Sequence, residues 1–269
     1  MRKEAVKNNV KIKFIFLPFP KEGGRRPDGL KLKSTKKFNY YRKTMNITES
    51  GFLNISDITE KKIVIWKDTH VVIFDNNTEI ETITLEENAK LDYFAYFSEE
   101  NIYNKHFITA WEKSEANVNC FLLSRWEKKV TAKIFWEVAN NNSKIDTDIV
   151  SLVQEGWIID LDGIIQINEQ VEKVEWYLDE TNIFLWDSWS VRGFPTLLVR
   201  SNDVKAGHGC NIEKISDEKL FYLRSRGMQR DDALLMMVQS YIETIFGRLE
   251  KTQKEYHDQL VEQILEEIR

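Results

Sequence analysis

Between Lys61 and Asn202 the sequence is a succession of short β-strand patterns, and this feature constrains the fold more than any other. Segments such as "KKIVIW", "KLDYFAYF", "VEWYL", "NIFLW" and "TLLVR" are rich in Val, Ile, Phe, Tyr and Trp, and several alternate apolar with polar residues. Polar clusters such as "FDNNTE", "ANNNSK" and "LDET" separate them. Because no long helical pattern interrupts the series, the chain is not an alternating α/β protein.

Two β architectures fit this pattern. A sandwich or barrel favours glycine-containing hairpin turns, and Asp162-Gly163 is the only Asn-Gly or Asp-Gly dipeptide in the strand region. A parallel β-helix instead stacks short strands rung on rung, with irregular polar corners. The polar corners suit a β-helix, although the sequence has no sharp repeat. The strand pattern alone leaves both architectures open.

A helical region begins at Ser216. Ser216 is a suitable N-cap, Asp217 and Glu218 follow in the first turn, and Gly227 is a natural stop. A second helix is predicted to start near Asp231, and its apolar stripe lapses at Thr252 and Gln253 and then resumes. The stripe consists of Leu234, Val238, Tyr241, Ile245 and Leu249, and then Tyr256, Leu260, Ile264 and Ile268. Helices at the end of a solenoid can close it with one face and offer another face to a partner.

The composition indicates a soluble protein of a reducing compartment. Of the 269 residues, 42% are hydrophobic and 30% are charged, and no apolar run approaches the length of a membrane span. Cys120 and Cys210 are the only cysteines and lie far apart in the sequence, so they form no disulfide framework. No signal peptide is recognisable at the N-terminus. We therefore expect a cytoplasmic protein, or a stromal one if the source is eukaryotic, with no membrane partner.

Charge is distributed unevenly along the chain. Residues 1–45 contain 14 Lys and Arg against three Asp and Glu, while the whole chain has a net charge of −5. A basic arm of this kind can bind nucleic acid, and its aromatic residues can stack on bases. The overall isoelectric point of about 5.6 argues against that use. We favour an arm that lies on an acidic protein surface, and we expect no nucleic-acid partner.

The segment "SNDVKAGHGCNIEKI" concentrates rare residues. It places one of four histidines, His208, and one of two cysteines, Cys210, within three positions, each beside a glycine. In an extended strand the side chains of residues i and i+2 share a side, so His208 and Cys210 would lie together. Imidazole and thiolate are both ligands for iron. The structural alternative is a strand end at which the glycines permit the turn into the helix.

The order of strands, His-Gly step and helices resembles the SufB/SufD family of iron–sulfur cluster assembly proteins. The resemblance rests on Asp203-Val204-Lys205, His208-Gly209, "LFYLRSRG" at 220–227 and Asp231-Asp232-Ala233. It is close over residues 158–246 and looser back to about residue 84. It implies a mainly β fold, namely a right-handed parallel β-helix over residues 61–215, followed by a C-terminal α-helical region over 216–269. Residues 1–60 stay unassigned.

Within the family, this chain is more similar to SufD than to SufB. SufB-type subunits carry an acceptor cysteine one or two rungs before the His-containing segment, and residues 156–202 here contain no cysteine. His208 stands where SufD-like proteins have an interface histidine implicated in cluster assembly. Many relatives have a cysteine where this chain has Ala206, and Cys210 stands in place of the usual alanine.

The resemblance implies a non-enzymatic scaffold subunit. It would bind a SufC-type ATPase, pair with a SufB-type paralogue or form a homodimer, and share a transient iron–sulfur cluster with that partner, without a permanently bound cofactor. His208 and Cys210 are the expected metal-binding residues. The residues expected at partner interfaces lie in the last strands and in the first helix: Leu198, Val204 and Lys205, and Phe221, Tyr222, Arg224 and Arg226.

Two other functions are open from the residues alone. A β-helix enzyme of the polysaccharide-lyase type would use clustered acids such as Asp160 and Asp162, which the pattern places at a corner. A nucleic-acid-binding module would use residues 1–45. Of the remaining histidines, we expect structural roles for His70 and His106 and a solvated position for His257.

Overall fold

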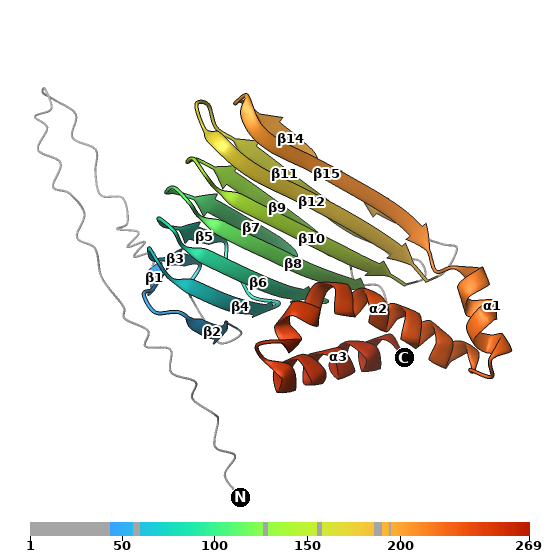
Figure 1. The fold of residues 1–269 in the computed structure, drawn as a ribbon. Coiled ribbons are helices and arrows are strands. Elements are labelled where there is room, and N and C mark those ends of the chain that lie inside the picture. Colours follow the sequence, from blue (N-terminus) through green and yellow to red (C-terminus); the bar gives the residue numbers. More distant parts are fainter. Residues whose placement is uncertain (1–43, 56–59, 126–128, 155–157, 186–189, 194) are drawn as a thin grey trace, which may run out of the picture.

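A computed structural model describes residues 44–269, apart from residues 56–59, 126–128, 155–157, 186–189 and 194. Its strands form two sheets in which all neighbouring strands run parallel, and the chain alternates between the two sheets (Figure 1). This arrangement is a parallel β-solenoid. The predicted β-helix is therefore confirmed, and the sandwich alternative is wrong.

The first sheet contains eight strands among the described residues. Seven of them follow one another in the order β1 (Thr44–Ile47), β3 (Lys62–Ile65), β5 (Thr82–Leu85), β7 (Ile102–Thr109), β9 (Val130–Val138), β11 (Ile158–Ile167) and β13 (Ser190–Arg192), and β14 (Thr196–Val199) also pairs with β11. The second sheet has the order β15 (Asp203–Lys214), β12 (Glu172–Phe184), β10 (Lys144–Val153), β8 (Glu115–Ser124), β6 (Lys90–Phe97), β4 (His70–Asn76) and β2 (Gly51–Asn54).

The solenoid extends beyond the predicted strand region. Strands β1 and β2 precede Lys61 and belong to the two sheets, so residues 44–54 are part of the same stack. The segment "VEWYL" and the residues "NIF" at 182–184 belong to one continuous strand, β12. Asp162-Gly163 is not a turn, because both residues lie inside β11. In β11 and β12, polar residues interrupt an apolar pattern without ending the strand.

Large side chains fill the interior of the solenoid. Alternate residues of each strand point inward, and Trp136 and Trp176 are 1% and 0% exposed. The Phe107 ring stacks on Trp136, with ring centroids 4.5 Å apart. A close-packed apolar column of this kind is the main source of stability in the stack.

Polar residues form the corners because the backbone there turns sharply. Asp68, Asn77, Asn88 and Asn142 have φ values of 59°, 55°, 55° and 58°. Asn and Asp adopt this left-handed conformation more readily than other residues with a side chain. Corners of successive rungs also bond to one another, since the Asn88 side-chain amide donates to Asp68 Oδ1 at 2.9 Å.

The helices cover one outer face of the solenoid (Figure 1). They are α1 (Asp217–Ser225), α2 (Arg230–Glu250) and α3 (Lys254–Ile268). The Ser216 hydroxyl accepts a hydrogen bond from the backbone of Lys219, which confirms the predicted N-cap. Outward-facing aromatic residues of the second sheet, such as Phe94 and Phe121, pack with α2 and α3 in a second apolar core. The expectation that the helices close the end of the solenoid is thus wrong, and its β15 edge stays open.

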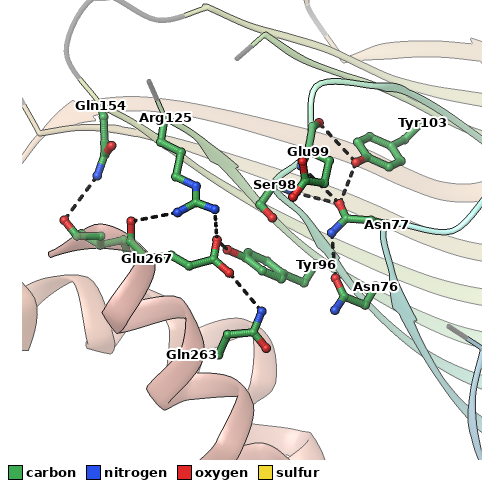
Figure 2. Close-up of polar contacts among 11 residues, drawn as sticks. Asn76, Asn77, Tyr96, Ser98, Glu99, Tyr103, Arg125, Gln154, Gln263 and Glu267 are labelled. Carbon is green, nitrogen blue, oxygen red and sulfur yellow. Dashed lines mark hydrogen bonds and ion pairs between the residues drawn. The ribbon is translucent and has the colours of Figure 1, made fainter. Parts of the chain in front are cut away.

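The end of α3 is tied to the strands by polar contacts (Figure 2). The Arg125 guanidinium and the Tyr96 hydroxyl both reach Glu267 Oε2, each at 2.9 Å. Gln154 donates to the carbonyl of Ile268 at 3.4 Å. The helical region is therefore anchored to β6 and to the ends of β8 and β10. Among the described residues, no helix is long and apolar enough to cross a membrane.

Candidate functional site

The segment "DVKAGHGCNIEK" forms β15, the last strand of the second sheet. It pairs with β12 on one side, and no other described strand pairs with its other side. His208 therefore lies in the middle of a strand that continues to Lys214, and the alternative of a strand end at the His-Gly step is wrong. The segment is the open edge of the stack.

The side of β15 that carries His208 continues the interior of the solenoid. Val204 and Ala206 on this side pack against the apolar core. His208, Cys210 and Ile212 follow at the same spacing and are exposed, because the described residues provide no further rung above them. The structure thus places the two predicted metal-binding residues together on an accessible face.

Each of these residues has a partner in register on β12. His208 lies beside Leu178, Cys210 beside Glu180 and Ile212 beside Asn182. The Asn182 amide donates to Cys210 Sγ at 3.9 Å, while no described residue hydrogen-bonds to the His208 ring. Burial raises the pKa of the Cys210 thiol above its usual value, and the neighbouring Glu180 carboxylate raises it further.

The glycines beside His208 face the opposite, outer side of the sheet. A Cβ atom at Gly209 would lie 2.5 Å from Asp179 Oδ1, and one at Gly207 would contact the Tyr177 ring at 3.6 Å. Glycine at these positions lets the side chains of β12 lie across β15. The space that these glycines leave is therefore on the outer face of β15, opposite the face that carries His208 and Cys210.

Glu180 is a site residue that sequence reasoning missed. Its side chain points into the solenoid directly behind Cys210, the residue is 2% exposed, and its Oε1 atom has no hydrogen-bond partner. Burial raises the pKa of this carboxyl to about 7, and Asp162 adds to the shift. The only signal in the sequence is an acidic residue within "LDET", a polar cluster that predicts a corner. In the structure this cluster lies inside β12, and Glu180 occupies an inward position.

The remaining interface residues of the last strands are exposed or half-buried. Leu198 on β14 is 43% exposed. Val204 packs partly against the core, and Lys205 points outward, where its Nζ atom lies 2.8 Å from Glu175 Oε1. Their predicted contacts with a partner remain predictions, since the structure contains one chain.

The first helix presents an apolar surface to solvent. Phe221 and Tyr222 of α1 are 74% and 54% exposed, so neither ring is a buried cap over the last rung. Arg224 is exposed, and the Arg226 guanidinium lies over the Tyr222 ring at 4.8 Å. A groove of about 410 Å³ between α1 and α2 is lined by Glu218, Lys219, Tyr222, Leu223, Met236, Met237 and Ser240.

Comparison with known proteins identifies the family. The family model described as "SUF system FeS cluster assembly, SufBD core domain" matches residues 81–241, which extend from just before β5 into α2. This match covers more than half of the chain. The chain belongs to the SufBD family.

Individual relatives match shorter parts of the chain. It is 32% identical over 79 residues to the iron–sulfur cluster assembly protein SufD of Escherichia coli, which covers 29% of this chain and 19% of that protein. It is 34% identical over 71 residues to a SufBD family protein of Archaeoglobus fulgidus, covering 26% and 19%. A SufBD family protein of Mycobacterium tuberculosis is 39% identical over 56 residues, covering 21% and 7%. The matched segments thus span at most 19% of these relatives' own length.

The other acidic residues and histidines considered in the sequence analysis lie elsewhere in the described part of the chain. Asp160 and Asp162 lie within β11 on its outer side, and Lys129 forms an ion pair with Asp160. His70 contacts Asp92 at 2.7 Å and His106 lies 3.4 Å from Glu137, as expected of structural residues. His257 is only 4% exposed, so its predicted solvated position is wrong. Its two ring nitrogens lie 3.0 Å from Glu243 and Asp258.

Proposed function

We propose that this chain is a SufD-like scaffold subunit of an iron–sulfur cluster assembly complex and is not itself an enzyme. It would pair with a SufB-type paralogue, or with a second copy of itself, and bind a SufC-type ATPase. The observation that carries the proposal is the exposed interior face of β15, where His208 and Cys210 stand above the last rung of the core. A related solenoid could continue both sheets across this edge.

The iron–sulfur cluster is cargo in this proposal and rests only transiently at the junction. The imidazole nitrogen of His208 is a suitable ligand for borderline iron. Cys210 offers a second ligand two residues on, and the partner supplies the rest, since a cluster needs four. We place the assembly in a reducing compartment, where Cys120 and Cys210 remain free thiols.

The ATPase contact belongs to the helical region. The exposed rings of Phe221 and Tyr222 beside the groove provide an apolar anchor, and Arg224 and Arg226 provide directional charges at its rim. Helix α1 follows directly after the C-terminal end of β15 (Figure 1), so the two proposed surfaces lie on consecutive elements. The nucleic-acid alternative depends on residues 1–45, nearly all of which lie outside the described part of the chain.

His208→Ala tests the proposed function. We expect client iron–sulfur proteins to mature about tenfold or more slowly, because an iron ligand is lost, while the variant still copurifies with the same partners. His70→Ala removes an exposed histidine on a distant rung and serves as the control. Normal maturation with His208→Ala would return His208 to a structural role.

A further inference from the structure

Glu180 is a charged side chain buried without a complete set of partners. Leaving a buried polar atom unsatisfied is destabilising, so such an atom needs an explanation, for example the binding of a ligand. The contrast within the same interior is Lys105, whose ammonium contacts Asp75 at 2.7 Å and two backbone carbonyls at 2.9 and 3.0 Å. The solenoid can therefore satisfy a buried charge, and at Glu180 it leaves one carboxylate oxygen free.

Space for this carboxylate comes from the opposite sheet. A Cβ atom at Gly163 of β11 would lie 2.4 Å from Glu180 Oε1, so any larger residue there would displace the carboxylate. The final ladder over β11 is also interrupted at this point. Strand β13 pairs with β11 up to Asp160, and β14 pairs with it again from Ile164. Residues 161–163 are thus unpaired on the β13/β14 side of β11, while they still pair with β9 on the other side.

The interruption is built into the backbone. Gly193 has a φ of 113°, and a Cβ atom there would lie 1.6 Å from the carbonyl oxygen of Leu161. A residue with a side chain could not occupy this position without moving the strand. Pro195, two residues on, has no N–H to donate to a ladder. The break over Leu161–Gly163 is therefore specified by the sequence.

Cys210 is the residue of β15 that lies beside Glu180 in register, and the Glu180 carboxylate acts electrostatically on its thiol. The two residues are in register on adjacent strands, and Asn182 donates to the Cys210 sulfur from the next inward position. A carboxylate and a thiolate side by side repel each other and attract a cation. Ferrous iron is borderline in character and accepts both oxygen and sulfur ligands.

We propose that Glu180 and Cys210 together bind ferrous iron at the open end of the solenoid. Iron takes Glu180 Oε1 and the Cys210 sulfur as ligands, the thiol proton and any proton held by the Glu180 carboxyl pass to solvent, and the metal remains ferrous. No three His, Cys, Asp or Glu side chains in the described ranges are grouped to hold a metal by themselves. The remaining ligands therefore come from water or from the subunit that covers β15. The identity of the cation rests on the proposed function.

Anaerobic titration of the full chain with ferrous iron against a competing chelator tests this site. We expect Glu180→Gln to weaken iron binding by about tenfold or more, as expected for loss of a ligand. As a control, Asp179→Asn removes the adjacent carboxylate on the outer face of β12. It should leave the affinity for ferrous iron within about twofold, because a solvated charge outside the site contributes little. Equal affinities of the two variants would overturn the proposal, as would a wild-type chain that binds no iron.

Cobalt(II) provides a second measurement that reports on folding and on the ligand. The thiolate-to-cobalt absorption band should vanish in Cys210→Ser and persist more weakly in Glu180→Gln. Without metal, Glu180→Gln should melt no lower than wild type, because the variant removes an unsatisfied charge. A lower melting temperature would assign Glu180 a structural role and overturn the proposal. Partner copurification, measured separately, tests the proposed function without reference to Glu180.

Discussion

The interior of the solenoid holds acidic residues in two different ways. Asp75 is fully enclosed and accepts from Lys105, from Tyr93 and from the backbone of Thr78. Glu180 is equally enclosed but retains a free oxygen. A satisfied network fixes the packing of the core, whereas an unsatisfied acid is destabilising until something binds it. The second case lies on β12, next to the β15 end of the stack where we propose the metal site.

Stability of the metal-free protein should reflect Glu180. Its pKa is raised from 4.5 to about 7 in the folded chain, so between these values the folded state holds a proton that the unfolded state has released. Stability is therefore retained at low pH and lost as the pH rises through 7. Glu180→Gln should abolish this loss, making the variant more stable than wild type at about pH 8 by on the order of 2–3 kcal/mol.

Urea unfolding with a chelator present, at about pH 5 and about pH 8, measures the difference. The variant and the wild-type chain should differ little at the lower pH and clearly at the higher pH. A difference in the free energy of unfolding that stays constant between the two pH values would contradict the assignment of the burial penalty to Glu180.

Sequence reasoning found part of this residue set. His208 and Cys210 could be placed on one side of a strand because the period of two is a local property. Glu180 could not be found in this way, because an acid in "LDET" has the composition of a corner, and only strand pairing shows that β12 runs through it. The unpaired oxygen depends on Gly163 in the other sheet, which no local pattern connects to it.

At the scale of elements, the helices separate a structural face from a free face. Phe246 of α2 is buried against Phe74, Phe94 and Phe121, with ring centroids 6.3 to 6.4 Å apart. Phe221 of α1 is exposed beside the groove. The same residue type thus serves packing on one helix and is available for binding on the other.

Two matched variants separate these roles. Phe246→Ala should lower the free energy of unfolding by about 3–5 kcal/mol, because it leaves a cavity between α2 and the strands. Phe221→Ala combined with Arg224→Ala should change it by less than about 1 kcal/mol, since both side chains are exposed. The double variant should nevertheless lose the ATPase in a pull-down experiment. If the folded double variant still bound the ATPase, the proposed ATPase contact on α1 would be wrong.

Helix boundaries were predictable, but helix placement was not. Ser216, Gly227 and the lapse at Thr252 are local signals, and the structure starts or ends helices beside each of them. The strand surface that the helices cover is formed by outward-facing residues, including those at the ends of β6, β8, β10 and β12. In the sequence these residues belong to apolar runs that do not distinguish a face covered by helices from a strand interior.

At the scale of the whole molecule, the rungs grow along the stack. In the second sheet, His70 of β4 lies in register with Lys90 of β6, and Lys90 with Glu115 of β8. Lys144 of β10 and Glu175 of β12 occupy the same position on the next two strands. The spacing therefore lengthens from rung to rung, which explains why the sequence has no sharp repeat. The longest strands lie at the β15 end, where the edge is open (Figure 1). Among the described residues, no strand pairs with the outer edge of β15, and an exposed edge of this length is able to pair with a strand of another chain.

In the function proposed above, the exposed face of β15 is the junction with a second solenoid. The most direct test is the mass of the purified complex, measured by light scattering, for two variants of exposed isoleucines. Ile212 lies on β15 beyond Cys210 and is 50% exposed, and Ile102 lies on β7 in the other sheet and is 64% exposed. We predict that Ile212→Glu, which would bury a charge at the junction, dissociates the solenoid partner, whereas Ile102→Glu leaves the complex intact. A complex of unchanged mass with Ile212→Glu would contradict the account.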